Sequence, residues 1–245
     1  MLKRDELRWL PWAPLLLAEG LYARIATARL PPAGDVEGRA GVGRAIRLVG
    51  LGDSIVAGIG VPTHSVGLVG QVSRLVASRA GIAVEWTAVG QSGATSALVL
   101  ERLVPRAIAL EPRLVVLSVG VNDAVAGVEP PLFKERLAAI VDALATSARR
   151  PAVVFGGIPP LETFPALPWP LSRLLGDRAR RLQQAAVDLV GYRGLRVVNF
   201  PRRIAAGGFA SDGFHPGEAG CAAWAQWVAD GFALSLEESA ATGRR

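Results

Sequence analysis

The sequence predicts an α/β protein in which a parallel sheet is the middle layer of a three-layer α/β/α sandwich. From residue 46 onward, short apolar runs rich in β-branched residues alternate with longer segments of helical spacing. The strand candidates are apolar throughout, which is typical of strands covered on both faces. Because βαβ crossovers are right-handed, these two observations restrict the topology to a doubly wound sheet.

Five strands and five helices account for this pattern. The strands are expected at residues 46–51, 82–89, 114–119, 152–155 and 195–200. The helices are expected around residues 66–80, 95–108, 132–148, 174–190 and 217–236. Since a helix follows each strand, we expect a five-stranded parallel sheet within one domain of residues 45–245.

The first 44 residues differ from this regular part. A basic start precedes an apolar run at residues 9–18, which is either the core of a signal peptide or a helix. Such a helix would pack on the body or contact a membrane surface through residues 9–30. Residues 31–44 are rich in glycine and proline and are expected to be a linker. Prolines and acidic residues disfavour export, so we expect a cytoplasmic protein, with export or membrane association as the alternatives.

Composition narrows the function classes. A chain of 245 residues can bury a core without disulfides or metals. One cysteine and two histidines leave little from which to build a metal site, so we expect no metal and no cofactor. The net charge is +6, from 27 basic and 21 acidic residues, but the arginines are scattered and no aromatic residues are interleaved with them. Nucleic acid is therefore not an expected partner. No apolar run reaches the roughly 18 residues of a plain transmembrane helix.

Polar clusters occupy the loops that follow the predicted strands. They lie at residues 52–54, 90–93, 120–123 and 212–216. Because ligands bind outside the carboxyl ends of the strands in such sheets, we expect these clusters to meet at one edge. Together they contain a hydroxyl group, a histidine, a carboxylate and glycine-rich turns, which are the groups that acyl transfer requires.

Ser54 is the candidate nucleophile, since Gly52 would let the backbone turn sharply and expose the hydroxyl. A serine hydroxyl needs a neighbouring base to take its proton. His215 is the candidate base, because Asp212 lies three residues before it and can accept its Nδ1 proton. His64 has no carboxylate near it in the sequence, so we expect it at the surface or at a pocket rim.

An oxyanion intermediate needs hydrogen-bond donors, and losing one donor typically raises the barrier by about 2.7–4 kcal/mol. The candidates are the backbone N–H groups of Ser54 and Gly90 and the side-chain amide of Asn122. A glycine at position 90 is expected to let a substrate approach closely. The neighbouring acids, Asp53 and Asp123, are expected to order their turns rather than to take part in chemistry.

The four clusters resemble the four sequence blocks of the SGNH/GDSL hydrolases, in the same order and over residues 46–236. The resemblance implies a flavodoxin-like sheet and serine-dependent ester hydrolysis. It implies these roles: Ser54 as nucleophile, His215 as base, Asp212 as its partner, and Gly90 and Asn122 as oxyanion donors. Val89 stands where relatives often carry alanine, a change that leaves the backbone N–H of Gly90 in place.

A proline-rich loop at residues 158–176 follows the fourth predicted strand, so it emerges at the same edge as the polar clusters. Long loops in this position often form lids or pocket walls. The apolar residues expected to form a wall for an acyl or aryl group are Leu161, Phe164, Leu167 and Trp169, with Ile55 and Val121 adding apolar surface. The alternative is a stiff loop that packs on its own body.

The predicted function is hydrolysis of short- to medium-chain acyl or aryl esters through an acyl-enzyme, with a small-molecule ester as the partner. Lysophospholipid or thioester hydrolysis and removal of O-acetyl groups from carbohydrates are alternatives within the same family. A non-catalytic, membrane-associated binding module is the alternative from another class. Flavin binding is disfavoured, because no phosphate-binding loop rich in serine and threonine follows the first strand.

Overall fold

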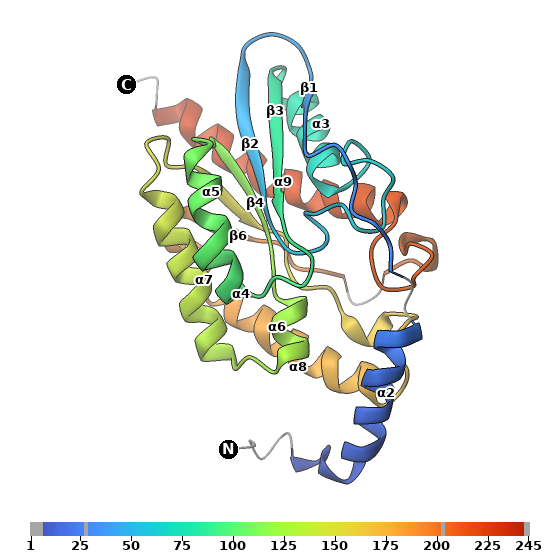
Figure 1. The fold of residues 1–245 in the computed structure, drawn as a ribbon. Helices are drawn as coiled ribbons and strands as arrows, with labels where there is room; N and C mark the ends of the chain where they lie inside the picture. Colours follow the sequence, from blue (N-terminus) through green and yellow to red (C-terminus); the bar gives the residue numbers. More distant parts are fainter. Residues whose placement is uncertain (1–6, 27–28, 202–203, 243–245) are drawn as a thin grey trace.

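The computed structural model describes residues 7–26, 29–201 and 204–242, and within them a sheet lies between two helical layers (Figure 1). The strands are β1 (Glu37–Ala40), β2 (Ala45–Gly52), β3 (Ala83–Gly90), β4 (Leu114–Ser118), β5 (Ala152–Phe155) and β6 (Arg196–Val197). Their spatial order is β1-β3-β2-β4-β5-β6. The predicted α/β/α sandwich is confirmed, with six strands in place of five.

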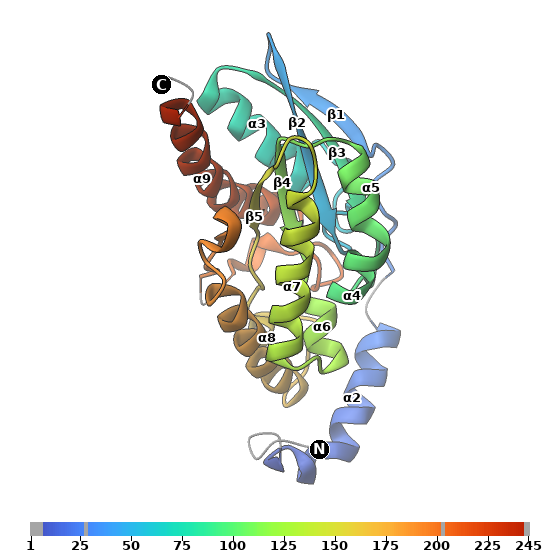
Figure 2. The ribbon, with the colours of Figure 1, turned by 90° about the vertical axis from the view of Figure 1, so that its left-hand side faces the viewer.

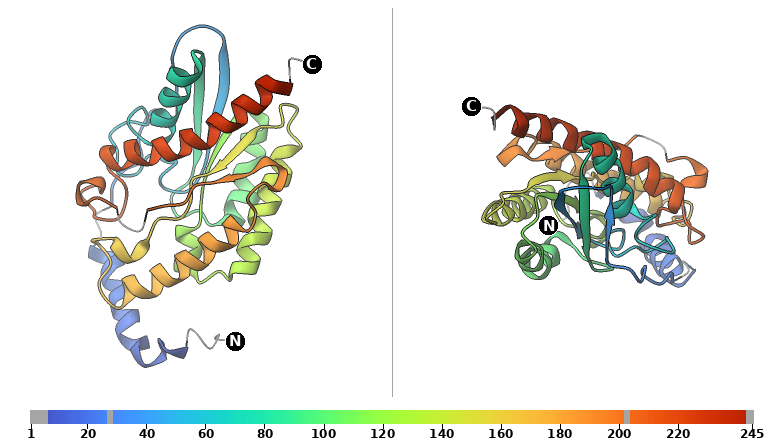
Figure 3. Two further views of the ribbon diagram at one scale, coloured as in Figure 1. Left: turned by 180° about the vertical axis from the view of Figure 1, so that it is seen from behind. Right: turned by 90° about the horizontal axis from the view of Figure 1, so that it is seen from above.

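Two long helices cover one face of the sheet, and three helical segments cover the other (Figure 2). The first layer holds α3 (Leu68–Ala80) and α9 (Glu218–Thr242). The second holds α7 (Pro130–Ala145), α8 (Leu171–Val187) and a continuous segment made of α4 (Ser96–Leu98), the π-helical turn η2 (Val99–Leu103) and α5 (Val104–Ala109). Figure 3 shows the α9 side and the edge-on view of the same layers.

Alternation along the strands divides the core between these layers. On β2, Val49 and Leu51 face the α5 and α7 side, whereas Leu48 faces α3 and α9. Gly50 also faces α3, and a Cβ atom there would lie 2.3 Å from Cγ2 of Val69. The missing side chain therefore sets how closely α3 approaches the sheet.

Strand β2 lies at the topological switch point of the sheet. It pairs in parallel with β3 on one side and with β4 on the other, so consecutive crossovers leave it in opposite directions. A crevice forms at such a point outside the carboxyl ends of the strands. The order of the five parallel strands is the flavodoxin-like one that the sequence predicted.

The sixth strand corrects the interpretation of residues 31–44 as a linker. Residues 37–40 form β1, which pairs antiparallel with β3 at the sheet edge, Glu37 opposite Thr87. Arg39 pairs with Glu85 of β3 at 2.9 Å, and a Cβ at Gly38 would lie 2.4 Å from the ring of Trp86. A short, polar edge strand carries no apolar run, so the pattern that identified the other strands could not identify this one.

Two further elements differ from expectation. The strand predicted at residues 195–200 is reduced to β6, because the chain turns away after Val198, whose carbonyl accepts a 2.9 Å bond from Nε2 of Gln183. The segment after β4, expected as a loop, forms the short helix α6 (Val121–Ala126), which ends at Gly127 with φ of 70°. A left-handed residue is a common helix C-terminus, and glycine adopts it without a Cβ penalty.

The N-terminal helix α2 (Ala13–Ala26) follows a short 3-10 turn, η1 (Leu10–Trp12), and lies beyond the carboxyl ends of the strands beside α8 (Figure 1). Its partly buried Leu16 packs against the larger core cluster. Oε2 of Glu19 accepts a 2.9 Å hydrogen bond from the backbone N–H of Leu171. Among the described residues, no helix has both the length and the apolar character needed to cross a membrane.

The end of β2 is closed by a backbone contact with β4. Gly52 has φ of +153°, and a Cβ atom there would lie 1.8 Å from the carbonyl oxygen of Ser118. The next residue, Asp53, donates its N–H to the same carbonyl at 3.1 Å. Any side chain at position 52 would therefore break this contact.

Replacing Gly52 by alanine should destabilise the fold by about 3 kcal/mol or more, because backbone atoms cannot yield as a side chain can. For a domain of this size, that loss corresponds to a fall in Tm of roughly 6–12 °C. Thermal unfolding of Gly43→Ala is the matched control, since Gly43 also has a positive φ of +91° but a Cβ atom there would have nothing within 4 Å. Equal Tm values for the two variants would contradict the role given to the Gly52 contact.

Candidate active site

Ser54 lies in the turn that follows β2, at the crevice of the switch point. The turn is held from within, because the Asp53 carbonyl accepts the N–H of Ala57 at 3.0 Å and the Ser54 carbonyl accepts that of Ile59 at 3.0 Å. Gly52 permits the sharp exit from the strand, as the sequence predicted. The Ser54 side chain is nearly buried, and its hydroxyl faces the loop that precedes α9.

The loop before α9 brings a carboxylate and an imidazole to that hydroxyl. Nε2 of His215 lies 3.0 Å from Oγ of Ser54, although the two residues are 161 positions apart. Nδ1 of His215 lies 2.6 Å from Oδ2 of Asp212. The structure therefore joins Ser54, His215 and Asp212 in one continuous hydrogen-bonded chain.

Both oxygens of the Asp212 carboxylate accept hydrogen bonds, which fix its orientation. Its Oδ1 accepts the backbone N–H groups of Phe214 and His215, each at 2.9 Å, which leaves Oδ2 for the imidazole. The Asp212 side chain is fully buried, whereas that of His215 is 17% exposed. A buried carboxylate held in this way keeps the Nδ1 proton on the imidazole and leaves Nε2 free to accept the serine proton.

Gly60 supports this loop from the serine side, and sequence reasoning missed it. A Cβ atom at Gly60, whose φ is +97°, would lie 3.0 Å from Cβ of His215 and 2.7 Å from the Pro216 carbonyl oxygen. The carbonyl of His215 also accepts the N–H of Ala210 at 2.8 Å. The spacing Gly58-Ile59-Gly60 after the serine was the available signal for this close approach.

The two remaining oxyanion candidates flank the serine turn. Gly90 ends β3 opposite Gly52, and a Cβ atom there would lie 2.3 Å from the backbone nitrogen of Ala57. Position 90 thus requires glycine because the serine turn packs on it, a reason other than the substrate approach that we expected. Asn122 lies in the first turn of α6, and its side-chain amide donates to the Ala94 carbonyl at 3.0 Å, which uses one of its two hydrogens.

The two acids beside the candidate residues are both buried and order the backbone. Oδ1 of Asp53 accepts the N–H of Ile55 at 3.2 Å, while Asp123 accepts the N–H of Ser96 at 2.9 Å and its hydroxyl at 2.5 Å. Burial raises the pKa of Asp53 to about 7, and the nearby Asp123 carboxylate adds to this effect. Burial likewise raises the pKa of Asp123, opposed by its bonds to Ser96.

His64 is not at the surface or at a pocket rim, which corrects the expectation for this residue. It is almost fully buried, and its Nε2 lies 3.0 Å from the carbonyl oxygen of Val56. Its backbone N–H donates to Oδ1 of Asp35 at 2.8 Å. The carboxylate near His64 comes from 29 positions earlier in the chain, so inspection of the neighbouring sequence could not reveal it.

An apolar cavity of about 450 Å³ opens beside Ser54 and His215. Three of the residues predicted to bind substrate line it, namely Ile55, Val121 and Phe164. The volume lies within the range of roughly 300–1,000 Å³ typical of small-molecule sites.

The other three residues of the predicted wall lie outside the cavity lining. Leu161, in the turn η3 (Leu161–Thr163), is fully buried in the core, and Leu167 is also buried there. Trp169 is 63% exposed and packs its ring on Trp12 at 5.0 Å between centroids. Leu161 and Leu167 therefore pack on the body, as the alternative interpretation had it, whereas Phe164 and Pro159 line the cavity.

Most of the cavity wall comes from residues that sequence reasoning did not select. The segment after β6 and the turn η5 (Ala206–Gly208) supply one side, and α9 supplies the other. The lining residues from these elements include Phe200, Ile204, Phe209, Ala219, Ala223, Trp224 and Trp227. Small residues one helical turn apart beside two tryptophans were the available signal on α9.

Among the residues that the structure describes, no group of three or more histidine, cysteine, aspartate or glutamate side chains could hold a metal ion.

Asp53→Asn should change how stability depends on pH. The folded protein keeps the Asp53 proton up to about pH 7, whereas the unfolded chain releases it near 3.8. The stabilisation from the protonated form is therefore complete below pH 3.8 and is lost as the pH rises to about 7. Unfolding measurements at several pH values should show that the free energy of unfolding of the variant rises relative to that of the wild type over this range, by on the order of 4 kcal/mol. If the free energy of unfolding depended on pH in the same way in the variant and in the wild type, the raised pKa of Asp53 would be contradicted.

Comparisons with known proteins agree with this geometry. The chain matches the GDSL-like lipase/acylhydrolase family over residues 51–223. A search of the curated proteins found no match. Solved structures with a similar fold include one described as TesA, 24% identical over 76% of this chain and 97% of that chain, with a TM-score of 0.59.

Two further structures show the same fold. The lipase/acylhydrolase from Enterococcus faecalis is 22% identical over 76% of this chain and 94% of its own, with a TM-score of 0.59. A family 3 carbohydrate esterase from Clostridium thermocellum is 17% identical over 75% of this chain and 92% of its own, with a TM-score of 0.55. With the family match covering the whole span from the end of β2 to the first turns of α9, the chain belongs to the GDSL-like lipase/acylhydrolase family of SGNH hydrolases.

Proposed function

We propose that this protein hydrolyses carboxylic esters through an acyl-enzyme formed on Ser54. The observation that carries the proposal is the continuous chain from Oγ of Ser54 through His215 to Asp212, with contacts of 3.0 and 2.6 Å. Membership of an acylhydrolase family supports the same chemistry. A nucleophile, a base within hydrogen-bond reach and a carboxylate that orients the base are the required set.

In the first half-reaction, Oγ of Ser54 attacks the ester carbonyl carbon while Nε2 of His215 takes the hydroxyl proton. Asp212 stabilises the resulting imidazolium through Nδ1. His215 then returns the proton to the leaving alcohol as the carbon–oxygen bond breaks. In the second half-reaction, water loses a proton to His215 and attacks the carbonyl carbon of the acyl-enzyme. His215 then gives this proton to Oγ of Ser54 as the bond between the acyl carbon and Oγ breaks, which releases the acid and restores Ser54.

The oxyanion of each tetrahedral intermediate is assigned to the N–H groups of Ser54 and Gly90 and the amide of Asn122. The contact of Asn122 with the Ala94 carbonyl fixes the amide in place before the reaction, and the second amide hydrogen remains for the oxyanion. Donors that are already oriented do not have to reorganise as charge develops, which is the basis of their effect.

The cavity favours an apolar acyl or aryl group of short to medium length. Among the described residues, the wall consists of apolar side chains and glycines besides Asp53, Ser54 and His215, and its apolar members include Phe164, Phe209 and Trp227. Such a wall stabilises methylene groups by about 0.8 kcal/mol each.

Lysophospholipid and thioester hydrolysis need the same nucleophile and the same apolar wall, so they remain alternatives for the substrate. Carbohydrate deacetylation is the further alternative, since one structural neighbour is a carbohydrate esterase. That reaction would place a polar sugar and only a methyl group at the site. The apolar lining favours the longer acyl group over this alternative.

Ser54→Ala should lower hydrolysis of p-nitrophenyl esters by at least roughly 10³-fold, because no other group replaces the nucleophile. The assay compares kcat/KM for acetate through long-chain esters in both proteins. Ser65→Ala is the matched control, since Ser65 is exposed and its hydroxyl bonds Thr63 at 2.7 Å away from the proposed chemistry. Equal rates in wild type and Ser54→Ala would overturn the serine mechanism and favour a non-catalytic module.

Filling the cavity should shift the preferred chain length. Ala223→Phe places a ring among the cavity residues of α9, so kcat/KM for octanoate should fall by roughly tenfold while that for acetate is retained. Trp169→Ala is the control, because Trp169 lies outside the cavity lining and its loss should leave the preference unchanged. If Trp169→Ala changed the preferred chain length and Ala223→Phe did not, the acyl group would bind against the proline-rich loop and not in this cavity.

A further inference from the structure

Helix α2 exposes apolar side chains to solvent, whereas Glu19, the charged side chain that the structure describes in this helix, faces the protein. On the outward side, Leu17 is 76% exposed and Leu21 is 61% exposed, one helical turn apart. Tyr22 extends the same surface and is 64% exposed. Glu19 points the opposite way and binds the backbone N–H of Leu171. A helix that only packs on a globular body shows the reverse arrangement.

Aromatic rings border this surface where the helix meets the loop before α8. Trp12 and Trp169 pack edge to face with centroids 5.0 Å apart, and both remain partly exposed. Tryptophan and tyrosine are enriched at the boundary between membrane and water, because one part of each ring system is apolar and another is polar. We call these two rings, together with the exposed side chains of Leu15, Leu17, Leu21 and Tyr22, the α2 face.

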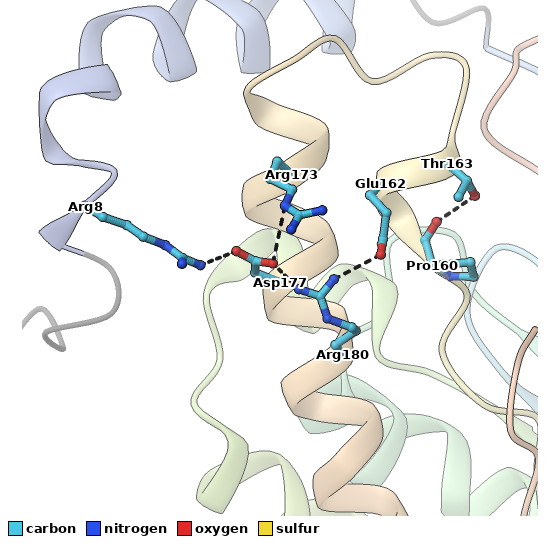
Figure 4. A network of polar contacts seen from close by, with 7 residues as sticks. All are labelled: Arg8, Pro160, Glu162, Thr163, Arg173, Asp177 and Arg180. Atoms are coloured by element: carbon cyan, nitrogen blue, oxygen red, sulfur yellow. Dashed lines mark hydrogen bonds and ion pairs between the residues drawn. The ribbon is translucent and has the colours of Figure 1, made fainter. Parts of the chain in front are cut away.

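A cluster of arginines joins the segment before α2 to helix α8, which lies beside α2 (Figure 4). Arg8, Arg173 and Arg180 surround the carboxylate of Asp177, and Arg180 also bonds Glu162 at 3.0 Å. Three basic groups thus meet two acidic ones, and each arginine side chain is more than half exposed.

The α2 face also lies at the functional end of the sheet. Helix α2 is beyond the carboxyl ends of the strands in two perpendicular views (Figure 1, Figure 2). The loop that carries Trp169 also carries Phe164, which lines the cavity beside Ser54. A surface that holds α2 would therefore lie at the same end of the molecule as the cavity.

We propose that the α2 face docks this protein on the surface of an anionic phospholipid bilayer. The leucines enter the boundary of the acyl region, the tryptophans and Tyr22 lie at the level of the headgroups, and the arginines contact the phosphates. The 14 residues of α2 span about 21 Å, less than the roughly 30 Å of a hydrocarbon core, so the helix lies on the bilayer. This proposal concerns binding and does not depend on the reaction assigned to Ser54.

Charge favours a bilayer over a second copy of the chain as the occupant. Docking two α2 faces would bring two basic clusters on chains of net charge +6 toward each other. Phosphate headgroups carry the opposite sign, and each arginine near an anionic membrane contributes about 1 kcal/mol to binding.

The test is flotation of the full chain with vesicles of phosphatidylcholine alone and of phosphatidylcholine with about one third phosphatidylglycerol. The variant Leu17→Glu/Leu21→Glu should lower partitioning onto the anionic vesicles by roughly tenfold, the effect of losing about 1.4 kcal/mol. The matched control is Val42→Glu/Val190→Glu, which makes the same change of charge at side chains that are 85% and 55% exposed away from α2. This control should bind within about twofold of the wild type.

Each outcome decides the proposal. Wild-type binding that prefers anionic vesicles, weakens with salt and is lost only in the α2 variant supports it. Absence of wild-type binding, or equal binding by the two double variants, overturns it. A wild-type dimer that the α2 variant dissociates in sedimentation analysis also overturns it, since the face is then a self-interface. The Tm of each variant shows that it is folded without reference to esterase activity, so the two proposals can fail separately.

Discussion

The site depends on the contact between the end of β2 and the end of β4. Gly52 approaches the Ser118 carbonyl so closely that no side chain fits, and Asp53 donates to the same carbonyl. This contact ends β2 at the switch point and begins the turn that carries Ser54. Because neighbouring crossovers diverge there, the hydroxyl lies at the opening between the two helical layers.

The second half of the site is built from the opposite end of the chain. Asp212 uses one oxygen for two backbone N–H groups and the other for His215, so the imidazole has little freedom to turn. Gly60 lets the serine turn pack directly on this loop. Close backbone packing therefore holds the serine turn against the loop before α9. The hydrogen bond between Ser54 and His215 is the path of the proposed proton transfer and is not needed to hold the two segments together.

Both the cavity and the outer surface at this end of the molecule are apolar. The cavity beside Ser54 is lined by aromatic and aliphatic side chains, and the α2 face outside it exposes leucines and tryptophans. Both are joined through the loop that runs from Pro159 to Trp169. An ester that partitions into a bilayer would meet a surface and a site of the same chemical character, which unites the two proposals.

The local patterns of the amino-acid sequence were enough to predict the α/β/α class, the five parallel strands and the grouping of Ser54, Asp212 and His215. Continuous apolar strands and residues that follow strand ends are local signals, and the rules of parallel sheets then bring those ends to one edge. Tertiary structure alone decided the polar edge strand β1, the burial of His64 against Val56, and the position of Trp169 on Trp12 rather than in the cavity. The cavity wall from Phe200 to Trp227 was likewise decided there. Each of these features depends on contacts between residues far apart in the chain. Such contacts leave no periodic pattern in a short stretch of sequence.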